Sequence, residues 1–157
     1  MWVLSAGTAT RADVSRVYFI NICSSPLSLR LPRQADEICT HNRHYAERSG
    51  YWLETNFLTD QAGRETTFYD AVTGLPLFVA PRGRTWEAFE EESRRHGWPS
   101  FRDEEVVWEN VRVLGDGETV STAGTHLGHN LGDGKGNRYC INLVCVAGNP
   151  QPSLGDR

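Results

Sequence analysis

The stretch VVWENVRVLGDGETVSTA, residues 106–123, gives the clearest indication of the fold class. Apolar and polar residues alternate over 106–114 and again over 118–123, which is the period-two pattern of half-buried strands. A Gly-Asp-Gly triplet at 115–117 separates the two runs and supplies the residue types that a tight turn needs. The stretch therefore predicts an antiparallel β-hairpin.

Further strands are expected on both sides of this hairpin. Aromatic, β-branched or apolar runs bounded by turn residues predict them, and they cover residues 51–57, 65–69, 75–80 and 138–147. Turns are expected at 61–64, 73–74 and 133–137. A regular alternation of strands and helices would indicate a parallel sheet, and the sequence shows no such alternation. We therefore predict a mainly β (α+β) domain with mostly antiparallel strands.

Helix signals occur in two short segments. The polar run 34–48 favours a short helix. In the second segment, 86–95, Thr85 can cap the amino end and Gly97 can end the helix. Acidic side chains come early and basic ones late in this segment, as the helix dipole favours.

Composition divides the chain into three parts. Residues 1–34 are rich in arginine and serine and hold one acid, which is typical of an organelle transit peptide but also fits a disordered tail or an extra strand over 17–23. Residues 35–148 hold the predicted domain, and residues 149–157 are expected to form a disordered tail. The expected compartment is the cytoplasm, or the mitochondrion or plastid if residues 1–34 are a transit peptide.

The charge balance narrows the choice of partners. The formal net charge of −4 does not indicate a basic surface for nucleic acid. No apolar run is long enough to span a bilayer. We therefore expect neither nucleic acid nor a membrane as a partner, and we expect a monomer.

The four cysteines are Cys23, Cys39, Cys140 and Cys145. An even number allows two disulfides, but a chain of 157 residues can build a core without them, and no secretory signal is evident. The sequence has no C-x-x-C pair, which argues against a zinc knuckle and against a thioredoxin-type dithiol. We therefore expect reduced thiols in an intracellular compartment.

The segment Arg138-Tyr139-Cys140-Ile141-Asn142 is the first candidate for chemistry. On a strand, Arg138, Cys140 and Asn142 share one face. A neighbouring guanidinium favours the thiolate, which is the reactive form of cysteine. The alternative is that Cys140 is a buried hydrophobe, which is the usual role of a cysteine in an apolar strand.

A pair of histidines, His126 and His129, is the second candidate. Their spacing suggests a metal pair or an acid–base pair. No nearby carboxylate or cysteine completes a recognised metal-ligand spacing, so a hydrogen-bonding or proton-donating pair is the better interpretation. The alternative is two surface histidines in a glycine-rich loop.

The segment HGWPSF, residues 96–101, is the third candidate. Gly and Pro fix the backbone around an aromatic pair, and Trp98 can form the apolar wall of a small pocket. The alternative is that Trp98 and Phe101 pack in the core.

Taken together, these segments resemble the methionine-R-sulfoxide reductase family. The resemblance covers about residues 68–147 and does not extend to residues 1–60. Its motifs occur in order as GLPLF at 74–78, GWPSF at 97–101, THLGH at 125–129 and NRYCIN at 137–142.

This resemblance implies a fold of two antiparallel β-sheets with short N-terminal helices. It also implies thiol-dependent reduction of methionine-R-sulfoxide to methionine, with repair of oxidised proteins. The implied catalytic residues are Cys140 as nucleophile and His129, His126 and Asn142 on the polar side of the pocket; the implied substrate-binding residues are Trp98, Phe101 and Arg138.

The implied chemistry suits these residue types. A sulfoxide sulfur becomes electrophilic once its oxygen is protonated or hydrogen-bonded, which His129 can do with the help of His126 and Asn142. Cys140 then attacks the sulfur, methionine leaves, and Cys140 remains as a sulfenic acid. A second thiol must return it to the thiol state.

The sequence departs from the family pattern at the zinc-binding positions. Many members carry two C-x-x-C pairs that hold a structural zinc, and the matching positions here are Asp70, Thr73, Val120 and Ala123. We therefore expect no metal and no cofactor, and only an external thiol reductant.

A second departure concerns the resolving cysteine, because the family's usual position is His96 here. Cys145 would lie on the opposite face of an extended strand, on the order of 16 Å from Cys140. Cys39 or Cys23 could approach from the N-terminal segment; otherwise thioredoxin or another small thiol must attack Cys140 directly.

A third departure from the family pattern is that Asn130-Leu131 replaces a phenylalanine of the family, which leaves the pocket shape and the substrate preference open.

Two other function classes are kept open. One is a non-catalytic module on the same fold that binds methionine sulfoxide or a partner protein without turnover. The other is a metal-dependent hydrolase or oxygenase that uses His126 and His129. Whether the substrate is an oxidised protein or free methionine sulfoxide is not defined by the sequence.

Overall fold

The computed structural model describes residues 37–40, 46–55 and 57–147 of the chain. The predictions for residues 1–34, for residues 149–157 and for Cys23 lie outside this part. Within it, no helix combines the length and the apolar character that a membrane crossing requires.

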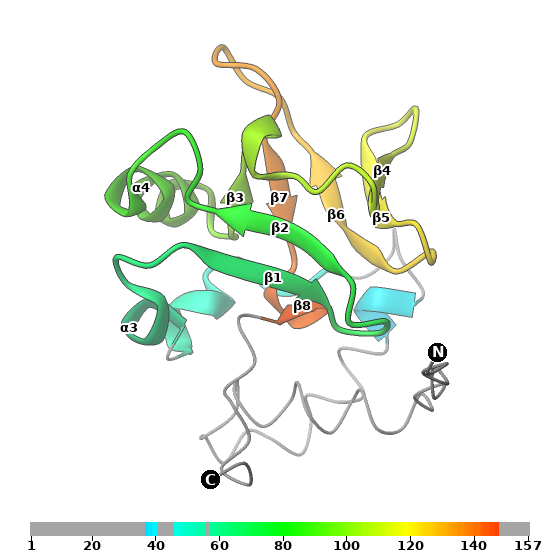
Figure 1. Cartoon of the computed structure of the whole chain (residues 1–157), viewed down its shortest axis with the longest axis horizontal. Coiled ribbons are helices and arrows are strands. Elements are labelled where there is room, and N and C mark those ends of the chain that lie inside the picture. The colour runs from blue at the N-terminus through cyan, green and yellow to red at the C-terminus, as the bar shows by residue number, and fades with distance from the viewer. Residues whose placement is uncertain (1–36, 41–45, 56, 148–157) are drawn as a thin grey trace, which may run out of the picture.

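The described residues form two antiparallel β-sheets, which confirms the predicted fold class (Figure 1). The smaller sheet has the strand order β2-β1-β8, with β1 (Thr66–Asp70), β2 (Pro76–Ala80) and β8 (Val146–Ala147). The larger sheet has the order β3-β7-β6-β5-β4, with β3 (Ser100–Phe101), β4 (Val111–Val113), β5 (Glu118–Ser121), β6 (His126–Asn130) and β7 (Tyr139–Ile141).

The predicted hairpin is the pair β4–β5. Val113 lies opposite Thr119. Gly117 closes the turn with a left-handed φ of 87° and donates its N–H to Leu114 O at 2.9 Å. The strand over 106–114 is shorter than predicted: η3 (Asp103–Glu105) precedes an isolated bridge at Val106, and residues 108–110 then form a turn before β4 begins.

Helix α4 (Trp86–His96) has the predicted caps. The Thr85 side chain accepts a hydrogen bond from the Ala88 N–H at 3.2 Å, and Gly97 ends the helix with a left-handed φ of 86°. Short helical segments also precede β1, at residues 37–40, in η2 (Tyr51–Glu54) and in α3 (Phe57–Gln61). The helix predicted over 34–48 does not extend through residues 46–48.

Two of the predicted strands are wrong. The chain is helical rather than extended in η2 and again from Phe57 onward, because Thr55 Oγ1 donates to Trp52 O at 2.6 Å and accepts from the Phe57 N–H at 3.2 Å. Such local side-chain hydrogen bonds compete with strand pairing. The strand over 138–147 is interrupted by η4 (Leu143–Cys145), which starts after Asn142.

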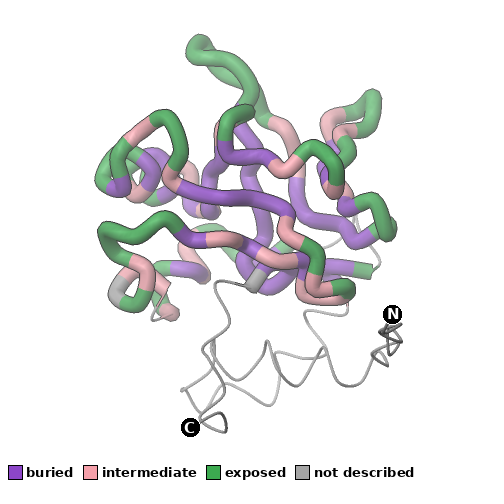
Figure 2. Tube along the Cα trace, in the orientation of Figure 1, coloured by how far each residue is buried: buried purple, intermediate pink, exposed green. Residues whose placement is uncertain are grey.

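The core lies where the two sheets cross, and the buried residues follow β2 and β7 there (Figure 2). Phe101 of β3 stacks on Phe78 of β2 with ring centroids 4.4 Å apart. The ring centroids of Phe68 of β1 and Phe89 of α4 lie 5.0 and 5.5 Å from that of Phe101. This packing fixes β3 and β7, whose other face is turned away from the core.

Candidate active site

A row of polar side chains crosses the larger sheet on the face away from the core. Ser100 of β3 lies opposite Cys140 of β7, and Cys140 lies opposite His129 of β6. His129 in turn lies opposite Glu118 of β5. Directly opposed residues of antiparallel strands project to the same face. Strand register therefore brings four residues from four strands together.

An irregularity between β5 and β6 adds His126 to this face. Two residues three positions apart on a regular strand point to opposite faces. Here Gly128 pairs with Thr119 and His126 pairs with Val120, so Leu127 is the extra residue of a bulge. The rings of His126 and His129 lie 5.5 Å apart, while the buried Leu127 side chain joins the core.

Glu118 orients His126. The His126 Nδ1 lies 3.1 Å from Glu118 Oε1, and both side chains are buried. A carboxylate at one ring nitrogen fixes the orientation of the imidazole. Sequence analysis missed Glu118, because an acid at the start of an alternating run carries no signal of its own.

Cys140 is 9% exposed and is the free cysteine of the described residues. Arg138 Nη1 donates to Cys140 Sγ at 2.5 Å, and Ser100 Oγ lies 3.8 Å from the same sulfur. Asp133 Oδ2 lies 3.6 Å from Arg138 Nε and forms an ion pair with the guanidinium. The guanidinium therefore places a positive charge directly beside the candidate nucleophile. The sequence-based expectation for Arg138 and Cys140 thus has a matching geometry.

Gly128 allows β6 to approach β7 at the nucleophile. A Cβ atom at this position would lie 2.0 Å from the backbone O of Cys140. Any side chain here would therefore push the strand that carries His129 away from the strand that carries Cys140.

Asn142 has a framework role that the sequence did not predict. Its Nδ2 donates to Leu127 O at 3.0 Å, and its Oδ1 accepts from the Glu47 N–H at 3.1 Å. The residue follows the end of β7 and has an extended backbone. Its hydrogen bonds instead tie the bulge of β6 to the segment that contains Glu47.

Trp98 is partly exposed and is held by the same segment. Its indole N–H donates to Glu47 O at 3.1 Å. Trp98 precedes Ser100 by two residues, and Ser100 Oγ donates to Trp98 O at 3.0 Å. Phe101, by contrast, is fully buried in the core, which corrects its assignment to substrate binding.

Glu47 is a buried acid that sequence analysis also missed. It is 1% exposed, and its Oε2 accepts from the Val144 N–H at 3.1 Å. Burial raises the pKa of Glu47 to about 7, although hydrogen bonds from the Leu143 and Val144 backbone act in the opposite direction. A single glutamate within a polar segment gives no sequence signal for a partner 97 positions away.

The expectation that all cysteines are reduced is wrong for two of them. Cys39 and Cys145 form a disulfide, and they are 3% and 0% exposed. Cys145 lies in η4 rather than in an extended strand. In this state Cys39 has no thiol to offer Cys140, so it cannot act as the resolving residue.

At the positions that the resemblance assigns to zinc ligands, Asp70 and Thr73 form a hydrogen-bonded cluster. Asp70 Oδ2 accepts from Thr73 Oγ1 at 2.8 Å and from Thr125 Oγ1 at 3.0 Å. Asp70 Oδ1 accepts from the Val72 N–H at 2.9 Å. The cluster links the β1–β2 turn of the smaller sheet to the β5–β6 turn of the larger one.

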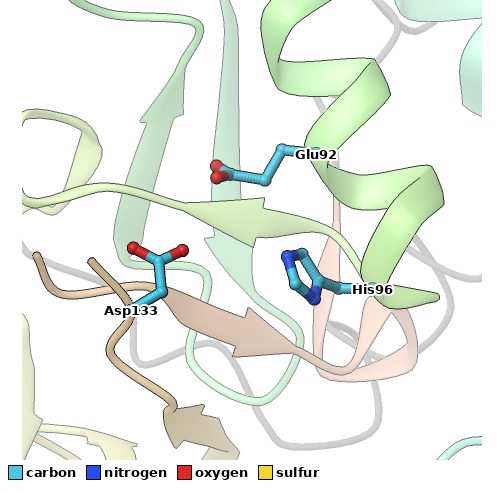
Figure 3. A group of neighbouring side chains, drawn as sticks. All are labelled: Glu92, His96 and Asp133. Atoms are coloured by element: carbon cyan, nitrogen blue, oxygen red, sulfur yellow. The ribbon is translucent and has the colours of Figure 1, made fainter. Parts of the chain in front are cut away.

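A second group of side chains lies beside the row. Glu92, His96 and Asp133 point toward one another, with their ligating atoms within 4.8 Å (Figure 3). Their carboxylates are already occupied by arginines: Arg84 lies 2.6 Å from Glu92, and Arg102 binds both Glu92 and Asp133. This ion pairing disfavours a metal ion. His126 and His129 belong to no potential metal-ligand group among the described residues.

The site therefore combines an arginine-bound thiol with two histidines, one of which is held by a buried carboxylate. The protein-family models and the curated proteins that we compared with the chain gave no match.

Proposed function

We propose that the protein is a thiol-dependent methionine-R-sulfoxide reductase that repairs oxidised proteins. The observation that supports this most strongly is the 2.5 Å contact between Arg138 Nη1 and Cys140 Sγ, on a strand whose neighbour carries His129 opposite the sulfur. Sulfoxide reduction needs a thiolate and a proton donor on one surface. In this proposal Cys140 supplies the thiolate and His129 supplies the proton donor.

In the reduction step, Cys140 attacks the sulfoxide sulfur while His129 hydrogen-bonds or protonates its oxygen. The oxygen passes from the substrate to Cys140, so methionine gains two electrons and the thiol becomes a sulfenic acid. The net reaction converts a thiol and a sulfoxide into a sulfenic acid and a thioether, without loss of atoms. Arg138 contacts the sulfur at the start and places its positive charge beside it.

Glu118 and His126 act as positioning residues for His129. The Glu118 carboxylate fixes the tautomer of His126, whose ring meets that of His129. Trp98 packs against the methyl group of the substrate and excludes the S epimer by shape. Its indole is fixed by the hydrogen bond to Glu47.

Because Cys39 and Cys145 are bonded to each other, no second thiol is available among the described residues, and the reductant in this proposal is an external thiol, thioredoxin or a smaller one. No metal or organic cofactor enters this chemistry.

An assay with dabsylated methionine sulfoxide and dithiothreitol tests the proposal. We expect the wild-type protein to reduce the R epimer and not the S epimer, and Cys140→Ser to be inactive with an unchanged circular dichroism spectrum. Activity of Cys140→Ser near the wild-type level would refute the assigned nucleophile. Absence of product from folded wild-type protein would refute the enzyme.

The disulfide motivates a second candidate, a module that binds methionine sulfoxide without turnover. With Cys39 and Cys145 paired, Cys140 has no partner thiol among the described residues. Saturable binding of an R-sulfoxide peptide, together with no methionine formed, would favour this module over the reductase.

A further inference from the structure

The proposed reductase leaves its nucleophile as a sulfenic acid, and the structure shows which residue can assist its recovery. Neither Cys39 nor Cys145 can attack in the described state, because each is buried and bonded to the other. The described residues thus offer no thiol to attack Cys140, which leaves an external one, and an ordinary alkyl thiol arrives protonated at neutral pH. The attack then needs a group that takes the thiol proton.

His96 is linked to the nucleophile through Asp133 and Arg138. It is the last residue of α4, and its half-buried imidazole points toward Asp133 of the β6–β7 loop (Figure 3). Asp133 contacts Arg138 at 3.6 Å, and Arg138 contacts Cys140 Sγ at 2.5 Å. His96 thus lies beside the ion pair that holds the nucleophile, and its partial exposure keeps it within reach of a thiol from solvent.

The charges around His96 keep it neutral near pH 7. Burial lowers its pKa, and Arg138 and Arg95 act in the same direction, whereas Glu92 and Asp133 act against them. A neutral imidazole can accept a proton.

The two carboxylates of the group are poor bases. Burial would raise the pKa of Glu92, but hydrogen bonds from Arg102 and Arg84 outweigh it and lower the pKa. The hydrogen bond from Arg102 lowers the pKa of Asp133 well below its ordinary value. Both therefore stay ionised and do not compete with His96 for the thiol proton.

We propose that His96 accepts the proton of the external thiol that attacks the Cys140 sulfenic acid; this rests on the proposed reductase activity. The thiol sulfur forms a bond to Cys140 Sγ, the S–O bond breaks, and the proton passes through His96 to the departing hydroxide, which leaves as water. A second thiol then releases Cys140 by thiol–disulfide exchange and is oxidised with the first to a disulfide.

The test isolates the recycling step from sulfoxide reduction. Cys140 of the full-length protein is oxidised with one equivalent of hydrogen peroxide, and loss of dimedone-reactive sulfenic acid is followed after a thiol is added. Two thiols are compared at pH 7: 2-mercaptoethanol, which is protonated, and 5-thio-2-nitrobenzoate, which is already ionised. The variants are His96→Gln and, as a control on the same helix turn, Arg94→Gln, whose side chain pairs with Glu90.

We expect His96→Gln to slow recycling by 2-mercaptoethanol roughly 100-fold and to leave recycling by 5-thio-2-nitrobenzoate unchanged. Arg94→Gln should match the wild type with both thiols. Equal slowing with the two thiols would show a merely structural role, and no slowing with either would show that His96 takes no part; both results overturn the inference.

The amount of methionine formed without reductant, measured for His96→Gln and for the wild type, distinguishes failure of the reductase proposal from failure of the His96 proposal. If His96→Gln forms one methionine per chain but recycles like the wild type, the reductase stands and the role of His96 falls. If wild-type protein forms no methionine, the reductase falls whatever the thiol results.

Discussion

The Arg138 guanidinium is the charged group that contacts Cys140 Sγ. Arg138 is 7% exposed and is held by Asp133, so its charge acts on the sulfur with little screening by salt. Ser100, the other close neighbour of the sulfur, carries no charge. The reactivity of the thiol therefore depends mainly on one side chain, which makes it open to a direct test.

Replacing Arg138 with glutamine should slow alkylation of Cys140 by iodoacetamide roughly tenfold at pH 7. Arg112→Gln is the control, since Arg112 bonds only backbone oxygens of Trp108 and Val111 on the far strand β4. Equal alkylation rates for Arg138→Gln and wild type at pH 7 would contradict this role.

Glu47 should make the protein less stable as the pH rises. Its carboxyl ionises near 4.5 in the unfolded chain but at about 7 in the folded one, so folding takes up a proton between these values. Stability from this group is therefore complete below pH 4.5 and lost as the pH rises through 7. Glu47→Gln, which cannot ionise, should be more stable than wild type at pH 8, on the order of 3 kcal/mol.

Urea unfolding at pH 4 and pH 8 measures this effect. The variant and the wild type should be similar in stability at pH 4 and should separate at pH 8. A glutamine variant that is no more stable than wild type at pH 8 would rule out a buried, protonated Glu47.

Single residues could be singled out from the sequence where the motif is local. Cys140, His126 and His129 lie within short motifs, and Arg138 is two residues from the sulfur that it contacts. Glu47 could not be found, because its contact with Asn142 spans 95 positions and depends on how the chain folds back. The resemblance implies that Asn142 lies on the polar side of the pocket. The spacing of its motif does not reveal that its side-chain amide is hydrogen-bonded to Leu127 and Glu47.

The bulge of β6 determines which side chains reach the site. It turns His126 to the face of His129 and sends Leu127 into the core. Gly128 follows the bulge and lets the backbones of β6 and β7 meet beside Cys140. A histidine pair of this spacing on a regular strand would split between the two faces.

Gly128→Ala should destabilise the protein by about 2–3 kcal/mol and reduce activity, because the new Cβ would collide with the Cys140 carbonyl. Gly115→Ala is the matched control, since nothing lies within 4 Å of a Cβ at that position and its φ is not in the left-handed region. Denaturant unfolding compares the two. Equal stability of Gly128→Ala and Gly115→Ala would contradict the close approach of the two strands.

Elements with a strong local signal were predicted, and those set by tertiary contacts were not. The β4–β5 hairpin and α4 carry their own turn and cap residues. The apolar run at 51–57 looked like a strand, but Thr55 stabilises two helical turns there. The interruption after Ile141 depends on Asn142 and on the pairing of β8 with β1, neither of which a local pattern contains.

The Cys39–Cys145 disulfide joins the helical segment at 37–40 to η4, directly before β8. The two cysteines are 106 positions apart in the sequence. Asn142 and Glu47 connect the same region to Trp98. The disulfide, together with the cluster around Asp70, thus binds parts that lie far apart in the sequence. The pairing could not be predicted, because four cysteines allow several connectivities.

Reduction of this disulfide should lower the free energy of unfolding by about 2–5 kcal/mol. Thermal unfolding of wild-type protein with and without dithiothreitol should therefore show a lower Tm in the reductant. The double variant Cys39→Ala/Cys145→Ala should show no such difference, whereas Cys140→Ser should behave like wild type. A wild-type Tm that does not respond to the reductant would contradict a stabilising disulfide.

Oxygen transfer from substrate to Cys140 can be measured in a single turnover. Wild-type protein is mixed with methionine-R-sulfoxide without any reductant, and dimedone then traps the sulfenic acid for peptide mass spectrometry. We predict one methionine formed and one dimedone adduct per chain, located on Cys140, with neither product from the S epimer. Methionine formed without modification of Cys140, or no methionine from folded protein, would contradict the proposed reaction.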